Sequence, residues 1–428
     1  MCYNSNLDMK DDLSGPAAQI AQMLAQKENF IIKCRWLAPL AKECAEAGFA
    51  GKPVIYDHAR INVENGIIAD VGNFFSRHDF KSRIIDCGDA LVTAPLVNAH
   101  THLQLSWLGT SVKWRNGFAE WLKSFVPQLI AASREKYDGS AERINSLEAA
   151  YKDLVRSGVL FVGDVGGTLP NAISCIARLA RAAGLEISHF CEWFGYNSDM
   201  LLPWPVANRA YLENFQTEIE AAPCGHALYS TSFDLLRNLK NWCARENRPF
   251  TFHLAECVEE TELLTSGSGA LFNYYENLVL PENWRPPGKT PVRLAHELGL
   301  LDRNTLAVHC VQCGKNDIEL LAESNCNVCL CPRSNNNLKV GEAPVKDMLK
   351  AGLKPCLGTD GLSSNTDLDV RKEAEWLIMK QDISPWDVLE MLTLNGFRAL
   401  GKKMEKVCIT RGNRIALALL DPFLYGLK

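Results

Sequence analysis

The sequence predicts an α/β protein in which a (β/α)8 TIM barrel is accompanied by a small β-sandwich domain built from both chain ends. Three observations lead to this fold class. From Ala90 onward, short apolar segments alternate with segments of helical period, and eight such strands can be counted. Segments near both chain ends read instead as strands separated by turn signals. We therefore divide the chain into an N-terminal polar segment and helix (1–30), a small β domain (31–93 plus 404–428) and a barrel (94–403).

The expected barrel strands are short apolar runs with helix candidates between them. The segment AERINSLEAAYKDLVRSG (141–158) closes on a glycine, and NDIELLAESN (316–325) opens on Asn316 as a cap. The connection between the fifth and sixth strands is long, and such a connection in a barrel is usually functional, so residues 257–288 are a candidate lid. The eight strands are expected at 90–103, 159–165, 186–195, 225–231, 249–256, 305–312, 326–332 and 354–361.

Composition and charge favour a small-molecule ligand over a macromolecular one. The 428 residues carry a net charge of −5 with a pI near 6.0. The Lys and Arg residues are scattered, so neither a nucleic-acid track nor a membrane-binding patch is expected. The N-terminus is polar and acidic rather than secretory, no run has bilayer-spanning length, and sixteen cysteines are spread through apolar segments as reduced thiols would be. We expect a cytoplasmic protein, with a homodimer as one option.

Polar side chains end three of the expected strands. His100 and His102 are two residues apart, so on a strand both side chains point to the same face. His253 and Asp360 end the fifth and eighth strands, and the eighth strand neighbours the first in a closed barrel. All four groups can therefore reach one point at the C-terminal mouth. Three imidazoles and a carboxylate suit one divalent metal ion, zinc as the first expectation and iron(II) as the alternative, with room for a bound water.

Two more side chains could carry acid–base chemistry beside this metal. Glu256 lies three residues past His253, where it can reach a substrate held over the metal as a proton shuttle. His309 ends the sixth strand and could orient an attacking water, whose proton Asp360 could accept. A metal lowers the pKa of bound water from about 15.7 to roughly 7, so hydrolysis is the chemistry to expect. Taken alone, Glu256 could also be a solvated carboxylate at a helix start.

Other histidine and cysteine positions have ordinary structural explanations. A single histidine at a strand end is more often a satisfied polar residue than a ligand, which is our expectation for His189. The pairs Cys310-x-x-Cys313 and Cys326-x-x-Cys329 repeat the spacing of a zinc ribbon. Both lie in or beside strands, where residues three apart point to opposite faces, so we do not expect these thiols to chelate a metal.

Four residues are candidate substrate contacts: Trp107, Arg115, His226 and Arg333. Trp107 and Arg115 lie in the loop after the first strand, on the catalytic side, where they could line a pocket for an aromatic ring or an anion. His226, at the fourth strand, could hydrogen-bond a ring nitrogen, and a structural role is equally open. Arg115 and Arg333 could each contact a ribose or a carboxylate, or be ordinary salt-bridged arginines.

Five stretches carry a resemblance to a known family. LVNAHTHLQLS, FHLAE, VHCVQ, CPRSN and LGTDGLSSN resemble the signatures of the amidohydrolase superfamily, in its branch of nucleobase and nucleoside deaminases and triazine hydrolases. The resemblance spans nearly the whole barrel. It implies that Glu256 protonates a ring nitrogen and then the leaving amine, and that His309 and Asp360 handle the water. It also implies one zinc or iron bound by His100, His102, His253 and Asp360.

The resemblance also narrows the expected chemistry. The fourth strand does not end in a lysine or glutamate that could bridge a second metal, so the chain is similar to mononuclear members of the superfamily. HTHLQLS, NGFAEWL and NWRPPGKTPVRLAHELGLL more weakly resemble aminodeoxyfutalosine deaminases. The implied activity is hydrolytic deamination of an aminopurine-type nucleoside or nucleobase, with 6-amino-6-deoxyfutalosine as one candidate. Alternatives are an S-adenosylhomocysteine/methylthioadenosine-type deaminase, a triazine-type chlorohydrolase or amidohydrolase, and, remotely, a non-catalytic scaffold.

Overall fold

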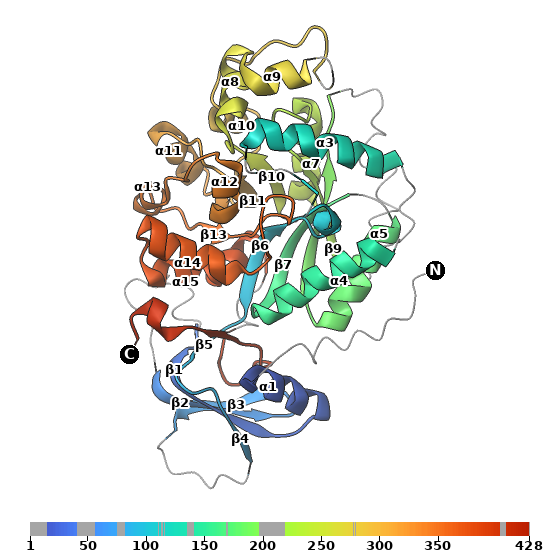
Figure 1. Ribbon diagram of the computed structural model, residues 1–428. Helices are drawn as coiled ribbons and strands as arrows, with labels where there is room; N and C mark the ends of the chain where they lie inside the picture. The colour runs from blue at the N-terminus through green and yellow to red at the C-terminus, as the bar shows by residue number, and fades with distance from the viewer. Residues whose placement is uncertain are drawn as a thin grey trace.

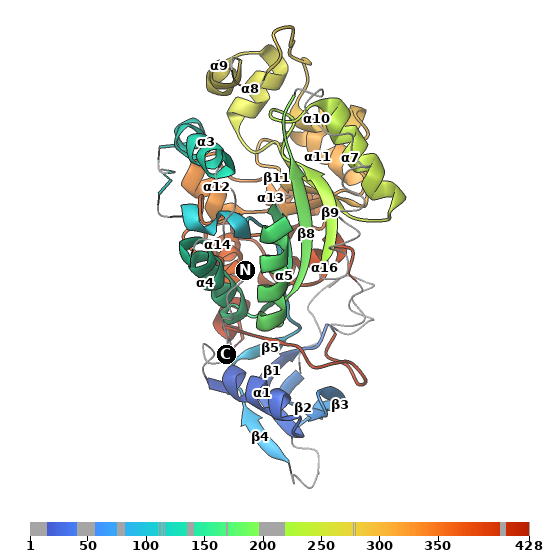
Figure 2. The same ribbon diagram turned by 90° about the vertical axis from the view of Figure 1, so that its right-hand side faces the viewer.

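The computed structural model describes residues 15–40, 56–74, 82–109, 111–112, 114, 116–134, 141–167, 170–196, 219–276, 278, 280–402 and 408–427. A small sheet lies at one end of the molecule, and a larger α/β part adjoins it (Figure 1). Helices α8 (Val258–Ser266) and α9 (Gly269–Tyr275) stand at the opposite end in both views (Figures 1 and 2). They occupy much of the segment 257–288, whose role as a lid stays a prediction.

Eight parallel strands of the described chain form two four-stranded sheets in the larger part. Within each sheet the strands follow one another in chain order, and helices make most of the crossover connections that parallel strands require. The first sheet contains β6 (Leu96–Thr101), β7 (Val159–Gly166), β8 (Glu186–Trp193) and β9 (Glu220–Gly225). The second contains β10 (Phe250–Leu254), β11 (Thr305–His309), β12 (Asn327–Leu330) and β13 (Cys356–Leu357).

Contacts join the two sheets at both edges. Ala227, just after β9, forms a parallel bridge to His253 of β10. At the other edge, the Asp360 N–H, just after β13, donates to the carbonyl oxygen of His100 in β6 at 3.1 Å. The Thr359 N–H likewise donates to Asn98 Oδ1 at 3.1 Å. These contacts bring the carboxyl ends of β6, β10 and β13 next to one another.

Two of the predicted strands are wrong in their bounds. Residues 90–103 divide into β5 (Leu91–Thr93), which belongs to the small sheet, and β6, because Pro95 has no N–H for a ladder hydrogen bond. The strand predicted at 225–231 instead spans Glu220–Gly225 as β9 and pairs with β8. Its sequence, EAAPCG, lacks the β-branched and aromatic residues that identify a strand.

Helices cover the two sheets (Figures 1 and 2). Capping residues in the sequence define some of their ends. Ser232 caps α7 (Phe233–Arg245) by accepting the Leu235 N–H. Gly158, with φ +82°, follows the end of α4 (Ala141–Arg156). A Cβ at Gly158 would lie 2.9 Å from the Cβ of Ala418, so the small sheet packs closely here.

The helices are α3 (Phe118–Arg134), α4 (Ala141–Arg156), α5 (Pro170–Ala183), α7 (Phe233–Arg245), α10 (Pro291–Glu297), α11 (Lys315–Glu323), α12 (Pro332–Leu338), α13 (Val345–Lys350), α14 (Val370–Gln381), α15 (Pro385–Leu392) and α16 (Leu394–Ala399). Short 3-10 turns lie at Leu103–Leu108 and Pro422–Tyr425.

The small sheet joins strands from both ends of the described chain. Its order is β14-β5-β1-β2-β3, with β4 also paired to β1. Helix α1 (Gly15–Gln26) buries Ile20 and Met23 in the same apolar cluster as this sheet. The described residues form one mixed sheet here, and the second sheet that a sandwich requires is not among them. The remaining strands are β1 (Phe30–Ala38), β2 (Tyr56–Glu64), β3 (Ile67–Asn73), β4 (Arg83–Asp86) and β14 (Ala418–Leu420).

Candidate active site

Three histidines meet at the carboxyl ends of β6 and β10. His100 lies in β6, His102 follows it, and His253 lies in β10. One ring nitrogen from each lies within 4.8 Å of the other two, and the Nε2 atoms of His102 and His253 are 3.4 Å apart. All three side chains are at least nine-tenths buried. The structure therefore brings together the three imidazoles that the sequence predicts as ligands.

Asp360 faces the same point from the end of β13. Its Oδ1 lies 3.6 Å from His100 Nε2 and 3.5 Å from His102 Nε2, beyond hydrogen-bond length. Its Oδ2 accepts hydrogen bonds from the hydroxyls of Ser334 and Ser364, at 2.7 and 2.5 Å. Asp360 also has φ +59°, a left-handed conformation that is rare for a non-glycine residue and is held here by surrounding contacts. The carboxylate is thus fixed with one oxygen directed at the imidazoles.

The hydrogen bonds of the imidazoles leave their Nε2 atoms available. The Nδ1–H of His102 can donate to the carbonyl oxygen of Val165 at 3.1 Å, and that of His253 to the carbonyl oxygen of His226 at 2.9 Å. Both ring nitrogens of His100 are buried without a hydrogen-bond partner among the described residues. Ligating histidines in metal sites show this arrangement, with the second nitrogen bonded to a carbonyl. The donor set of three imidazoles and one carboxylate therefore fits a zinc or ferrous ion.

The electrostatics of these groups also suit a cation. Burial lowers the pKa of His100 to about 4 and holds the pKa of His253 well below its ordinary value, so both rings are neutral. Burial acts to raise the pKa of Asp360, but the neighbouring imidazoles outweigh it and hold that pKa well below its usual range. A negative carboxylate beside neutral imidazoles is the protonation state that metal binding requires.

Glu256 and His309 lie together beside this centre. The Oε1 of Glu256, which follows β10, is 3.6 Å from Nε2 of His309 at the end of β11. Burial, with a further contribution from the charge of Asp360, raises the pKa of Glu256 well above its ordinary value. His309 has φ +73°, and its Nδ1 lies 2.9 Å from Oδ1 of Asn335. A buried carboxyl group that holds its proton can act as a proton donor.

Sequence reasoning missed several residues that hold this centre in place. Ser334 and Asn335 come from CPRSN, and Ser364 comes from LGTDGLSSN, so their motifs were recognised but not their contacts. Glu260 was not singled out, although its Oε2 accepts the backbone N–H of Glu256 at 2.9 Å. The i, i+4 spacing of these two glutamates at a helix start was the available signal.

The candidate substrate contacts lie in different surroundings. His226 follows β9, its Nδ1 is 2.6 Å from the Ser230 hydroxyl, and its ring centre is 4.9 Å from that of His253. Trp107 is half-buried, and the centre of its ring lies 4.6 Å from Cζ of the Arg143 guanidinium. Arg115 lies outside the described residues. Of these candidates, His226 is the described residue whose ring lies next to an imidazole of the histidine centre.

Arg333 is held by an internal ion network. Its guanidinium donates to both carboxylate oxygens of Asp367 at 2.9 and 3.0 Å, to the Thr366 hydroxyl at 2.6 Å and to Glu373 at 3.4 Å. Glu373 is fully buried and also receives a hydrogen bond from Asn365. This network favours the salt-bridged explanation of Arg333, because most of its donors are already occupied.

The other histidine and cysteine positions agree with their structural explanations. His189 bonds through Nδ1 to Asp164 at 2.9 Å, and both side chains are fully buried. Cys310, Cys313, Cys326 and Cys329 are free thiols. Among the described residues, the groups close enough to share a cation consist of histidines with or without Glu192 and include no cysteine.

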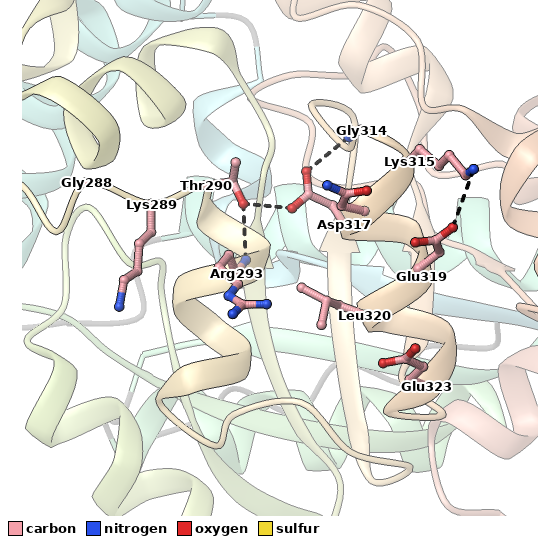
Figure 3. A pocket seen from close by; sticks show the side chains of 11 residues that line it. Gly288, Lys289, Thr290, Arg293, Gly314, Lys315, Asp317, Glu319, Leu320 and Glu323 are labelled. Atoms are coloured by element: carbon pink, nitrogen blue, oxygen red, sulfur yellow. Dashed lines mark hydrogen bonds and ion pairs between the residues drawn. The ribbon is translucent and has the colours of Figure 1, made fainter.

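A surface groove of about 730 Å³ lies apart from the histidines, between α10 and α11 (Figure 3). Asp317 links its two walls, accepting hydrogen bonds from the Thr290 hydroxyl at 2.7 Å and from the Gly314 N–H at 3.0 Å. Helix α11 accordingly begins at Lys315 with Gly314 as its cap, two residues before the predicted cap Asn316. The groove contains none of the predicted site residues.

Comparison with known proteins relates this geometry to a family. Residues 91–425 match the amidohydrolase family. A 5-methylthioadenosine/S-adenosylhomocysteine deaminase of Moorella thermoacetica is 30% identical over 358 residues, which cover 79% of this chain and 75% of that protein. Among solved structures, the aminofutalosine deaminase of Helicobacter pylori in complex with methylthio-coformycin has a TM-score of 0.72 at 20% identity and covers 91% of each chain. The atrazine chlorohydrolase of Arthrobacter aurescens TC1, complexed with zinc, has a TM-score of 0.71 at 17% identity, over 91% of this chain and 86% of that chain. The two structures share the α/β fold with this chain.

Proposed function

The chain belongs to the amidohydrolase family, and from this premise we propose that it is a metal-dependent aminohydrolase that deaminates an aminopurine-type nucleoside or nucleobase. Membership of this family makes it a hydrolase that acts on C–N bonds other than peptide bonds. One observation carries the proposal: a buried glutamate with a raised pKa lies beside three imidazoles and a carboxylate that face one point. Deamination of a ring needs such a proton donor next to an activated water.

We also infer that β6 to β13 close into a (β/α)8 barrel over residues 94–403, with residues 31–93 and 404–428 forming the small domain. The bridge between Ala227 and His253 and the hydrogen bond from the Asp360 N–H to His100 support closure at the two edges between the sheets. The pairing of β14 with β5 supports a small domain shared by both chain ends. In a barrel, catalytic residues gather at the carboxyl ends of the strands, as the histidines do here.

In this proposal one divalent ion is held by His100, His102, His253 and Asp360, with zinc as the first expectation and iron(II) as the alternative. When bound, such an ion lowers the pKa of a water molecule that it contacts to roughly 7 and so makes a nucleophile available at neutral pH. The buried, unpartnered nitrogens of His100 support this ligand set, because a cation would satisfy one of them. Catalytic zinc sites can expand to five ligands, which these four side chains and one water would require.

The chain's own residues then move the protons. His309 orients the attacking water, and Asp360 takes a proton from it. Glu256 donates its proton to a ring nitrogen, which makes the neighbouring carbon a better electrophile. A C–O bond forms at the carbon bearing the exocyclic amine and the C–N bond breaks. Glu256 takes up the proton of the new C–OH group and passes it to the amine, which leaves as ammonia. The proton held by Asp360 then returns to Glu256, so both carboxyl groups end the cycle as they began it.

His226 is the proposed contact to the ring on the side of β9. Its bond to Ser230 is short at 2.6 Å, whereas the Ser230 hydroxyl is 3.4 Å from the carbonyl oxygen of Ala227. This difference favours a serine that donates to Nδ1, which leaves a proton on Nε2 for a ring nitrogen. Trp107, Arg115 and Arg333 remain candidate contacts to the rest of the substrate. The relatives favour an adenosine-type nucleoside, with 6-amino-6-deoxyfutalosine, methylthioadenosine and S-adenosylhomocysteine as candidates.

Ammonia release from zinc-loaded protein tests this function directly. The panel comprises adenosine, 5′-deoxyadenosine, methylthioadenosine, S-adenosylhomocysteine and 6-amino-6-deoxyfutalosine, with loss of the aminopurine absorbance as a second readout. We expect release from at least one of them, and release from none would contradict the proposal. Chloride release from a chlorotriazine in the same preparation would move the assignment to a triazine-type hydrolase, which the likeness to atrazine chlorohydrolase makes the second candidate. A protein that binds no zinc or iron would instead indicate a non-catalytic scaffold.

A further inference from the structure

Glu192 lies beside the candidate metal centre, and no step of the proposed reaction uses it. It is the second-last residue of β8, and its carboxylate lies within 4.8 Å of ring nitrogens of His226 and His253. One oxygen, Oε1, is buried and has no hydrogen-bond partner among the described residues. A buried acceptor without a partner costs free energy, which a ligand that donates a hydrogen bond would recover. The structure therefore contains an acceptor that still needs a donor.

A second metal ion is a poor explanation for this group. His253 would have to supply a nitrogen to both centres, but its Nδ1 is bonded to the carbonyl oxygen of His226 at 2.9 Å. Its Nε2 lies 3.4 Å from Nε2 of His102, at the first centre. Glu192 and His226 alone are too few side chains for a zinc site, which takes at least three protein ligands.

The gap between Glu192 and His226 adjoins the proposed ring contact, because their facing polar atoms lie within 4.8 Å of each other. A substrate group next to the ring would therefore meet the Glu192 carboxylate. The backbone holds both residues in place, because the His226 N–H donates to the carbonyl oxygen of Trp193 at 2.9 Å, directly after Glu192. A hydroxyl or ammonium group in this gap would donate to Oε1.

The charge near this gap selects against anions. Within the described residues, Glu192 forms no ion pair with a lysine or arginine, so its carboxylate is not neutralised by the protein. A substrate carboxylate placed against Glu192 would meet a like charge in a partly buried site, where screening by water is weak.

We propose that Glu192 determines substrate class: it accepts a hydrogen bond from a hydroxyl or ammonium group at the sugar end of the nucleoside and disfavours a carboxylate there. The proposal rests on the proposed deaminase function. Glu192 should make the protein prefer adenosine-type nucleosides with a neutral or cationic 5′ substituent over those with an anionic one. Glu192 contacts the substrate without exchanging a proton with the ring.

Three compounds with the same ring test this: 5′-deoxyadenosine, 5′-amino-5′-deoxyadenosine and adenosine-5′-carboxylate. The wild-type protein should deaminate the neutral and the cationic compound with kcat/KM about 10- to 100-fold above that for the carboxylate. Glu192→Gln should lower kcat/KM for the ammonium compound about tenfold and raise it for the carboxylate. The matched control is Glu186→Gln at the exposed start of the same strand, which should leave all three values unchanged. Melting temperature and zinc content verify that each variant is folded and loaded.

The outcomes separate this proposal from the function on which it rests. Absence of ammonia from every compound overturns the deaminase function, and the role of Glu192 with it. Deamination in which the wild-type protein prefers the carboxylate, or treats all three compounds alike, overturns the role of Glu192 alone. The same holds if Glu192→Gln deaminates with unchanged preferences. If that variant does not fold, the preference of the wild-type protein still decides the question.

Discussion

Two hydroxyls hold Asp360, and removing them should weaken metal binding without changing any proposed ligand. Ser334 and Ser364 donate to Oδ2 at 2.7 and 2.5 Å, while Oδ1 faces His100 and His102 at 3.6 and 3.5 Å. The hydroxyls thus fix the rotation of the carboxylate. Replacing both serines by alanine leaves Oδ2 buried without these donors and frees the side chain to turn.

The size of the effect follows from these two hydrogen bonds. A hydrogen bond to a charged group contributes about 1.5–3 kcal/mol, and loss of a group that supports a metal ligand typically reduces affinity 10- to 100-fold. The hydroxyl oxygens of Ser334 and Ser364 also lie 2.8 Å apart, so either can partly replace its partner. We expect zinc affinity to fall about tenfold in each single variant and roughly 100-fold or more in the double variant.

Competition with a chromophoric chelator measures these affinities. Ser363→Ala is the matched control in the same loop, because Ser363 contributes its backbone carbonyl, which accepts the Trp121 indole N–H at 2.9 Å. It should bind zinc as the wild-type protein does. A double variant that keeps wild-type affinity would mean that Asp360 is not a ligand oriented by these hydroxyls, and the proposed ligand set would then be wrong.

Three further predictions concern proton transfer and stability. Glu256→Gln should lower kcat roughly 10²- to 10⁴-fold with zinc content unchanged, because the amide cannot deliver a proton. Burial acts to lower the pKa of His189, but its hydrogen bond to a buried aspartate outweighs burial and raises that pKa to about 10. Its stabilising effect is therefore complete below about pH 6.5 and is lost as the pH rises through about 10, so the free energy of unfolding should fall more between pH 7 and 10 in the wild-type protein than in His189→Gln. Arg333→Met should lower the free energy of unfolding by about 2–4 kcal/mol in urea, because Glu373 loses its buried cation.

Each of these has a contradicting outcome. Glu259→Gln, at a half-buried position in the first turn of α8, is the control for Glu256, and equal losses in the two variants would argue against a proton shuttle. Parallel pH profiles of unfolding for wild-type protein and His189→Gln would indicate that the imidazole is neutral in the folded state. Arg333→Met with unchanged stability but a raised KM would favour a substrate contact over a structural role for Arg333.

The sequence was sufficient to predict which residues stand at the ends of the strands. Strand periodicity is local, so His100 and His102 had to share a face wherever the strand packed. The order of apolar runs then located His253 and Asp360 at corresponding ends, and the structure brings these side chains together. Glu256 was identified by the same spacing argument, because it lies just beyond a strand end.

Hydrogen-bond partners from distant segments were decided by the tertiary structure alone. Ser334 reaches Asp360 across 26 residues, and Arg333 meets Asp367 across 34 residues, so no local pattern reveals either contact. The position of β9 depended on pairing with β8, because its own residues carry no strand signal. Glu192 has no motif around it, and its proximity to His226 exists only once β8 and β9 lie side by side. Side-chain identity fixes what chemistry a residue can perform, whereas its neighbours across the fold fix its protonation, its orientation and the ligand it can meet.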